Sequence, residues 1–229
     1  MSYVLHYAPD NASLIIRLAL DAIGAPFSTV LVDRSKQEQR SPAYRKLNPN
    51  GLIPTLETPS GVLFETGAIL LWLVDTHGTL GPGPKDAGRA DFLKWLFFCA
   101  NTVHPHMRLL FYPDKLVGSD PSQCTAVIKG AQRALLSDFA TLEHAAGQSF
   151  GGDTPTAIDM YLVCMLRWCA IYGPEDRNWF TLADTPRLFH ICRRANTWPS
   201  TEIAKTDEGL GPTPFTAPKR PNPPEGSAL

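Results

Sequence analysis

The segment that most constrains the fold of this chain is Gly81-Pro82-Gly83-Pro84, in which glycine and proline alternate. Neither a helix nor a strand continues easily through such a segment, because proline lacks an N–H group and glycine is conformationally permissive. The residues before this segment show both strand and helix patterns, whereas the residues after it show only helix patterns. We therefore expect two domains, at residues 1–80 and 87–210, joined by a linker at 81–86.

The N-terminal part begins with a strand, a helix and a second strand. Residues 3–7 alternate as in a short strand, residues 14–23 carry apolar side chains at helical spacing, and residues 27–32 form another strand pattern. This order implies parallel strands joined by a right-handed crossover. A hairpin between residues 55 and 64 and a buried helix at 65–74 complete a predicted α/β domain.

The remainder of the chain carries the signals of an all-helical domain. A helix is predicted over residues 87–111 with a kink or break at Pro105, and another after the Asp120-Pro121 start signal. Thr156 and Asp159 resemble the ends of a capping box before a buried helix, and a further helix follows Pro186. Residues 211–229 contain six prolines, which ordinarily gives a mobile, extended tail.

Composition limits the classes of binding partner and the cellular location that we expect for this chain. The formal net charge is -1, which gives no electrostatic footprint for nucleic acid or an anionic membrane. The five cysteines include no C-x-x-C and do not cluster with histidine, so we expect reduced thiols and no metal site. The first residues lack the features of an export signal, and no segment is long and apolar enough to span a membrane. A cytoplasmic protein is predicted.

Short motifs in register resemble the cytosolic glutathione S-transferase family, and the resemblance extends over nearly the whole chain. Residues 5–14 are similar to the first strand and catalytic loop of that family, residues 48–56 to its N-P-x-G-x-[VI]-P-x-L signature, and residues 65–69 to its E-[ST]-x-A-I segment. Residues 156–159 resemble the family's buried helix cap. The resemblance implies a thioredoxin-like domain followed by a helical bundle, with glutathione as co-substrate and no metal.

The resemblance also implies how glutathione would be bound. Pro54 stands in the place of the cis-proline, which leaves the Ile53 main chain to pair with the extended tripeptide. Glu65 and Thr66 begin a helix, where side-chain oxygens and free N–H groups would hold the γ-glutamyl end. Simple helix capping is the alternative role for these two residues.

The glycyl end of glutathione has no evident partner in the motif. Leu52 occupies a place where family members commonly carry lysine or glutamine. The glycyl carboxylate would then need another partner, with Lys36, Gln37 and Gln39 within reach.

Three residues of the catalytic loop are candidates for stabilising the glutathione thiolate: Asn11, then Ser13, then Tyr7, in that order of preference. Each has a structural alternative, since Asn11 suits a left-handed turn, Ser13 a helix cap and Tyr7 the core of the sheet. Ala12 occupies the place of the cysteine of cysteine-type members. Mixed-disulfide chemistry, and with it thiol transferase activity, is therefore disfavoured.

The predicted second-substrate pocket is formed by His104, Met107, Arg108 and Phe111, whose surface suits an apolar electrophile. Packing between helices or subunits is the alternative for each, and the proline-rich tail could close over the cleft. The expected function is glutathione transfer to small hydrophobic electrophiles by a homodimer. Part of the apolar and aromatic run at residues 95–98 should be buried between subunits or between domains. A non-catalytic glutathione-binding protein remains an alternative, as does a glutathione-dependent isomerase, dehalogenase or peroxidase.

Overall fold

The computed structural model describes residues 2–173 and 178–228. Its N-terminal half contains a mixed four-stranded sheet in the order β2-β1-β3-β4, in which β1 and β2 run parallel and the other neighbouring pairs run antiparallel. The strands are β1 (Tyr3–Tyr7), β2 (Phe27–Leu31), β3 (Thr55–Thr58) and β4 (Gly61–Phe64). This is the predicted thioredoxin-like arrangement, with the parallel pair made by the βαβ unit and the antiparallel pair by the hairpin.

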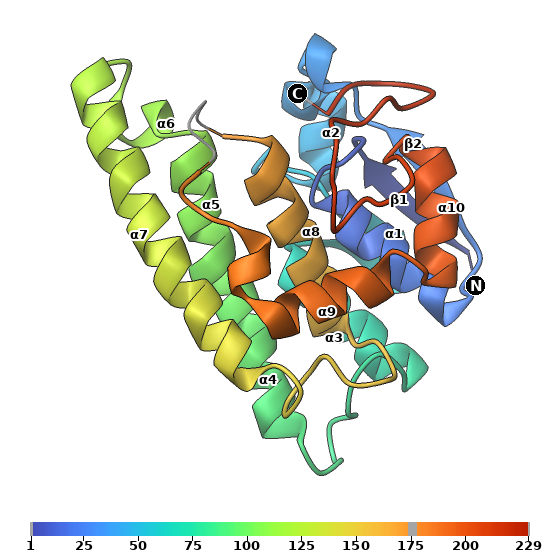
Figure 1. Ribbon diagram of the computed structural model, residues 1–229. Coiled ribbons are helices and arrows are strands. Elements are labelled where there is room, and N and C mark those ends of the chain that lie inside the picture. Colours follow the sequence, from blue (N-terminus) through green and yellow to red (C-terminus); the bar gives the residue numbers. More distant parts are fainter. Residues whose placement is uncertain (1, 174–177, 229) are drawn as a thin grey trace.

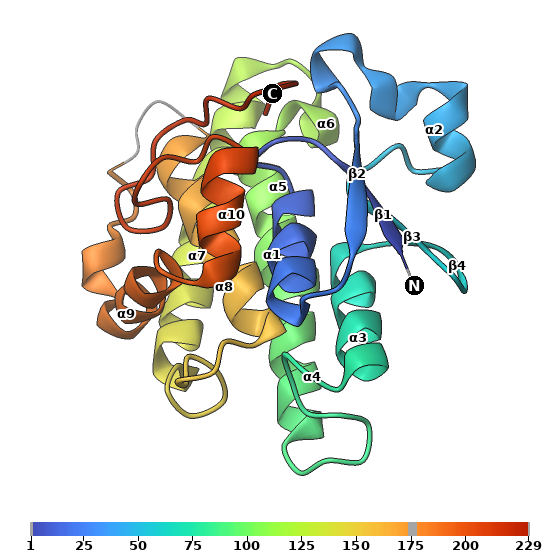
Figure 2. The same ribbon diagram turned by 90° about the vertical axis from the view of Figure 1, so that its right-hand side faces the viewer.

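Helices cover this sheet on both sides. Figure 2 shows α1 (Ser13–Ile23) and α3 (Thr66–His77) between the sheet and the helical half of the molecule, while α2 (Pro42–Leu47) lies on the far side. Residues Leu14 to Leu20 of α1 are all buried, which explains why the helix carries apolar side chains on more than one face. Helix α2 and two short 3₁₀ helices, η1 (Arg34–Lys36) and η2 (Glu38–Arg40), were not predicted from the sequence.

The second half is helical, as expected, and is arranged around α8 (Figure 1). All but one of the residues of α8 are buried, and its start is fixed by the predicted capping box, with Thr156 accepting from the Asp159 N–H and Asp159 accepting from the Thr156 N–H. The helices are α4 (Arg89–Phe98), α5 (His104–Phe111), α6 (Asp114–Val117), α7 (Pro121–Ala145), α8 (Ala157–Ile171), α9 (Pro186–Ala195) and α10 (Pro199–Asp207), with a 3₁₀ turn η4 (Leu182–Asp184). Residues 78–88 connect α3 to α4, and the proposed domain border at 81–86 stays a prediction.

The predicted break at Pro105 takes the form of a π-helical turn. Residues Cys99–Val103 form this turn between α4 and α5, and the His104 N–H donates to the Cys99 carbonyl five positions earlier. Pro105 has no N–H to continue the regular ladder, so the local widening occurs one turn before it. The turn itself lies against the start of α3, where a Cβ on Gly67 would lie 3.0 Å from the Ala100 Cβ.

The proline-rich tail is packed against the rest of the chain. The Arg167 guanidinium on α8 donates to the Pro214 and Lys219 carbonyls of the tail, and Gly226 approaches β2 so closely that a Cβ there would lie 2.6 Å from Leu31. The Arg34 guanidinium donates to the Ala228 carbonyl, at 2.5 Å. Extended proline-rich backbone cannot bond to itself as a helix or sheet does, and side chains of the folded part supply partners instead.

Two findings bear on the expected environment of the protein. All five cysteines are free thiols, four of them buried. No helix among the described residues is long and apolar enough to cross a membrane. The cytoplasmic location stays a prediction.

Candidate active site

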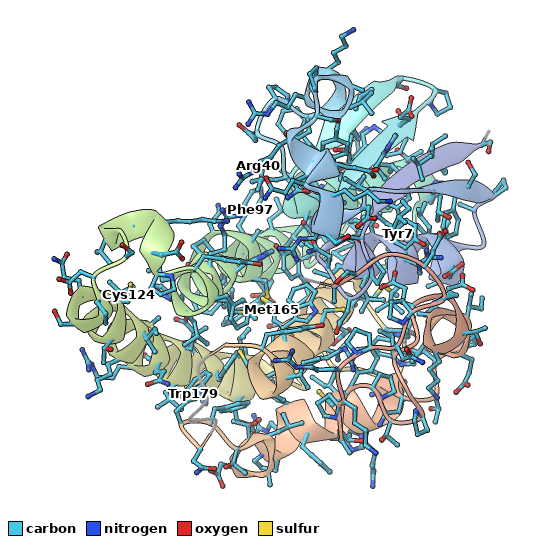
Figure 3. The ribbon with its side chains drawn as sticks, turned by 90° about the horizontal axis from the view of Figure 1, so that it is seen from above. Tyr7, Arg40, Phe97, Cys124, Met165 and Trp179 are labelled. Atoms are coloured by element: carbon cyan, nitrogen blue, oxygen red, sulfur yellow. The ribbon has the colours of Figure 1, made fainter. Side chains whose placement is uncertain are left out.

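One cavity of about 860 Å³ lies where the sheet half meets the helical half. Its walls are formed by the β1–α1 loop, the segment from η1 to Pro54, the start of α3, the region from α4 to α6, α8 and the tail. Figure 3 shows Arg40 and Phe97, two of its residues, facing each other across this junction. The predicted site residues that line it are Asn11, Leu52, Ile53, Pro54, Glu65, Thr66, His104, Arg108 and Phe111.

The start of α3 presents an anion-binding arrangement to the cavity. Thr66, Gly67 and Ala68 line it, and the first intrahelical bond of α3 is donated by Ile69 to the Glu65 carbonyl, so the N–H groups before Ile69 have no partner in the helix. Glu65 has a φ of 73° and makes no capping hydrogen bond. The capping alternative therefore has no support for Glu65, whose exposed carboxylate lies beside the free N–H groups.

The segment before β3 is anchored by side chains from α2 and from Asn48, the residue that follows it. The Leu52 carbonyl accepts from the Tyr44 hydroxyl at 2.7 Å and from the Asn48 amide at 2.8 Å. The next peptide, Ile53–Pro54, is cis. The Ile53 main chain makes no hydrogen bond within the described residues and lines the cavity. An extended peptide could therefore pair with it, as in strand addition.

The β1–α1 loop is fixed by a buried ion pair. Asp10, with a φ of 48°, accepts from Arg167 Nε at 2.8 Å and Arg167 Nη2 at 2.9 Å. The same carboxylate accepts from Trp168 Nε1 at 2.9 Å and the Tyr172 hydroxyl at 2.7 Å, and both Asp10 and Arg167 are buried. Asn11 follows directly. Its side-chain oxygen accepts from the Ala12 N–H at 2.8 Å, and its side-chain NH₂ has no partner within the described residues.

Tyr7 and Ser13 lie outside the cavity. The Tyr7 side chain points to the tail (Figure 3), where its hydroxyl donates to Glu225 at 2.5 Å, and burial followed by the bond to Glu225 raises its pKa well above the usual range. The Ser13 hydroxyl is buried, donates to the Ala8 carbonyl at 3.0 Å and accepts from the Ala8 N–H at 3.2 Å. Of the three candidates for the thiolate, the structure brings only Asn11 to the cavity.

The helical wall joins the two halves of the site through hydrogen bonds. His104 Nδ1 lies 2.8 Å from the Tyr161 hydroxyl, and Tyr161 in turn interacts with the Thr66 side chain. Burial, with a smaller contribution from Arg108, lowers the pKa of His104 to about 4, so its imidazole is neutral at pH 7. Met107 is fully buried in the core and does not line the cavity, because it lies about 100° around α5 from Arg108 and packs inward.

The partner of the glycyl carboxylate, left open in the sequence, has new candidates. Lys36 pairs with Asp33 at 2.9 Å and Gln37 bonds to Arg40, and neither lines the cavity, whereas Gln39 does. Arg40 and Arg45 also line it, and a Cβ on Gly51 would lie 3.7 Å from Arg45 Nε. A guanidinium beside the Leu52 segment can bind a carboxylate through two parallel bonds.

Several residues of the cavity were not predicted from the sequence, because they come together only in the folded chain. Asp10, Tyr161 and Trp168 lay in patterns that we assigned to the loop or to buried helix, and nothing local marks them as part of a site. Arg34 and Arg220 come from opposite ends of the chain. A cationic side chain soon after a predicted strand, as at Arg34, was the one available signal.

Comparison with known proteins agrees with the geometry. The model of the glutathione S-transferase N-terminal domain matches residues 2–75, and that of the C-terminal domain matches residues 125–194. A maleylpyruvate isomerase of Ralstonia sp is 33% identical over 158 residues, 65% of this chain and 73% of the relative, and glutathione S-transferase GST-4.5 of Xanthomonas campestris is 30% identical over 179 residues, 75% of this chain and 84% of the relative. A sphingomonad glutathione S-transferase solved with glutathione is 26% identical, covers 91% of this chain and 100% of its own, and superposes with a TM-score of 0.73. These matches confirm the resemblance found in the sequence: the chain belongs to the glutathione S-transferase family.

Proposed function

We propose that this protein is a glutathione transferase, with glutathione bound along the sheet side of the cavity. The free main chain of Ile53 pairs with the tripeptide, the N–H groups at the start of α3 bind the γ-glutamyl carboxylate, and Glu65 binds its ammonium group. Arg40 or Arg45 receives the glycyl carboxylate. The observation that carries the proposal is the start of α3, where N–H groups and a carboxylate that have no partner among the described residues lie side by side.

In this pose the thiol of glutathione lies near Asn11. A thiol has a reference pKa of about 8.5, and lowering it by about two units requires roughly 2.7 kcal/mol in favour of the anion. A hydrogen bond to a charged acceptor supplies about 1.5 to 3 kcal/mol, so the free NH₂ of Asn11 suffices if it reaches the sulfur. The thiolate then forms a C–S bond to the electrophilic carbon, and the displaced electron pair leaves with the leaving group or moves into a conjugated system.

A glutathione-dependent isomerase is the second candidate. Its support is the relative named maleylpyruvate isomerase, to which this chain is 33% identical. Such a reaction uses the same bound thiolate, adds it to a double bond and later expels it, so the glutathione half of the site is common to both functions.

Calorimetric titration with glutathione tests the proposal. We expect Glu65→Ala to weaken binding by about 2 kcal/mol, which is about 30-fold in Kd, because the ammonium group loses its charged partner. Glu202→Ala, which removes an exposed carboxylate on α10, should leave the affinity unchanged. Equal affinity in the wild type and Glu65→Ala would refute the assigned pose.

We further propose that the protein is a homodimer. Phe97 is 44% exposed, although Leu96 beside it is buried and Trp95 and Phe98 pack within the chain. Phe97 also lines the cavity, and an aromatic ring this exposed beside it suits an interface between two copies. Light scattering should give twice the mass of the chain at micromolar concentration, and a 25.1 kDa species would contradict the proposal.

A further inference from the structure

The cavity contains more positive charge than glutathione requires. Six cationic side chains line it: Arg34, Arg40, Arg45, Arg108, Lys115 and Arg220. Among the described residues none of the six takes part in an ion pair. The formal net charge of the chain is only -1, so this excess is local to the cavity and does not follow from the composition.

The carboxylates of the cavity do not balance these cations. Asp10 and Glu65 are the acidic residues that line it, and Asp10 is already paired with Arg167. In the proposed pose the Glu65 carboxylate binds the ammonium group of glutathione. The γ-glutamyl carboxylate is held by the start of α3 and the glycyl carboxylate by Arg40 or Arg45. Apart from Arg40 and Arg45, the four other cations have no carboxylate partner among the described residues of the protein, and glutathione offers them none.

These four cations lie on the part of the wall formed by α5, α6 and the tail. Arg34 reaches this wall from the sheet half, since its guanidinium donates to the Tyr112 hydroxyl at 3.1 Å. Lys115 lies 4.1 Å from the centre of the Tyr112 ring. Arg108 is one helical turn before Tyr112.

The fourth cation comes from the tail, and aromatic surface lies between the four. Arg220 lines the cavity and is close enough to Tyr172 to act on its pKa. Phe111 and Trp168 line the same cavity and provide apolar surface. A ligand bound there would meet aromatic rings and several guanidinium groups together, an arrangement that suits a small molecule carrying carboxylates.

We propose that the second substrate of this protein is an electrophile bearing at least one carboxylate, which Arg108 and Arg220 bind, with Arg34 and Lys115 adding to the positive field. This inference rests on the proposed function and departs from the purely hydrophobic electrophile expected from the sequence. Several unpaired cations within one concavity concentrate the field there, so an anionic substrate gains both in encounter rate and in binding.

Two glutathione thioethers test the proposal: S-(1,2-dicarboxyethyl)glutathione and S-butylglutathione, whose S-substituents have the same number of carbon atoms. Neither has a thiol, so any effect of the cations on thiol ionisation does not enter the comparison. We expect the dicarboxylate to bind at least about tenfold more tightly than the butyl thioether in the wild type, since one charge-assisted bond has about this effect. The difference should shrink as salt is raised.

Variants locate the effect within the cavity. Arg108→Gln and Arg220→Gln should each reduce the ratio of the two affinities by about fivefold or more, and Arg133→Gln, an exposed position on α7 outside the cavity, should leave it unchanged. Arg40→Gln should leave the ratio unchanged. Equal binding of the two thioethers in the wild type, or a ratio that Arg108→Gln and Arg220→Gln do not alter, would overturn the inference while the glutathione site stands. If glutathione and both thioethers fail to bind, the proposed function itself is wrong.

Discussion

Replacing Arg167 by methionine is the strongest test of how the catalytic loop is held. Arg167 is fully buried and its two donors to Asp10 lie at 2.8 and 2.9 Å. Arg167→Met keeps the volume of the side chain and leaves the Asp10 carboxylate buried without its counter-charge. Removing one partner of a buried pair destabilises a protein by about 3 to 5 kcal/mol. The remaining bonds from Trp168 and Tyr172 place the expected loss at the lower end of that range.

For a chain of this length, a loss of about 3 to 4 kcal/mol lowers Tm by about 10 °C. Scanning calorimetry measures this change directly. Arg133→Met, at an exposed position, should stay within about 0.5 kcal/mol of the wild type. Turnover of the remaining folded Arg167→Met protein should also fall, because Asn11 follows Asp10 and depends on the same loop conformation.

The double variant Asp10→Asn/Arg167→Met separates the buried charge from simple loss of packing. Asparagine is neutral and tolerates the positive φ of this position. Its oxygen can still accept from Trp168, and its NH₂ can donate to the Tyr172 hydroxyl, which then acts as the acceptor. We therefore expect the double variant to be more stable than Arg167→Met alone. If it is no more stable, or if Arg167→Met lowers stability by less than about 1 kcal/mol, the ion pair does not hold the loop as we argue.

Two further predictions concern the thiolate and the effect of pH. Asn11→Ala should lower turnover at pH 7 roughly tenfold or more with little change in glutathione affinity, whereas Ser13→Ala and Tyr7→Phe should act mainly on stability; a thiolate lost only in Tyr7→Phe would contradict this order. Burial raises the pKa of Glu208 from 4.5 to about 7, against the opposing effect of Arg17, so its contribution to stability is fully present below about pH 4.5 and is lost as the pH rises through about 7. Denaturation by urea across this range should show a smaller loss of stability with rising pH in Glu208→Gln than in the wild type, and equal slopes would refute the assignment.

Local patterns in the sequence predicted the elements that carry the site. Strand β1, the hairpin, the cap of α8 and the helix starting near Glu65 each have a signal within a few residues, such as alternation, a capping box or a proline at the first position. The family motif also located the cis peptide at Pro54. Helices α2 and α10 are short, and their patterns are too brief to be told apart from loops.

The orientation of side chains was harder to predict than the elements themselves. Tyr7 and Ser13 lie in the expected region, but the Tyr7 hydroxyl donates to Glu225 in the tail and the Ser13 hydroxyl donates to the Ala8 carbonyl. The Asp10–Arg167 pair joins residues that are 157 positions apart, and no local signal announces it. The group of cations at the cavity likewise depends on the fold of the tail, which brings Arg220 beside residues of α5 and α6. Contacts of this kind are decided by tertiary packing.

The most direct test of the whole account is an ultraviolet difference titration of the glutathione complex, which detects the thiolate of the bound ligand. If Asn11 and the positive field of the cavity act on the sulfur as we propose, the thiolate band is already present at pH 7, because the bound thiol titrates about two units below the usual value near 8.5. Calorimetry under the same conditions shows whether the site is filled. Bound glutathione whose thiol titrates at the same pH as in free solution would contradict the account.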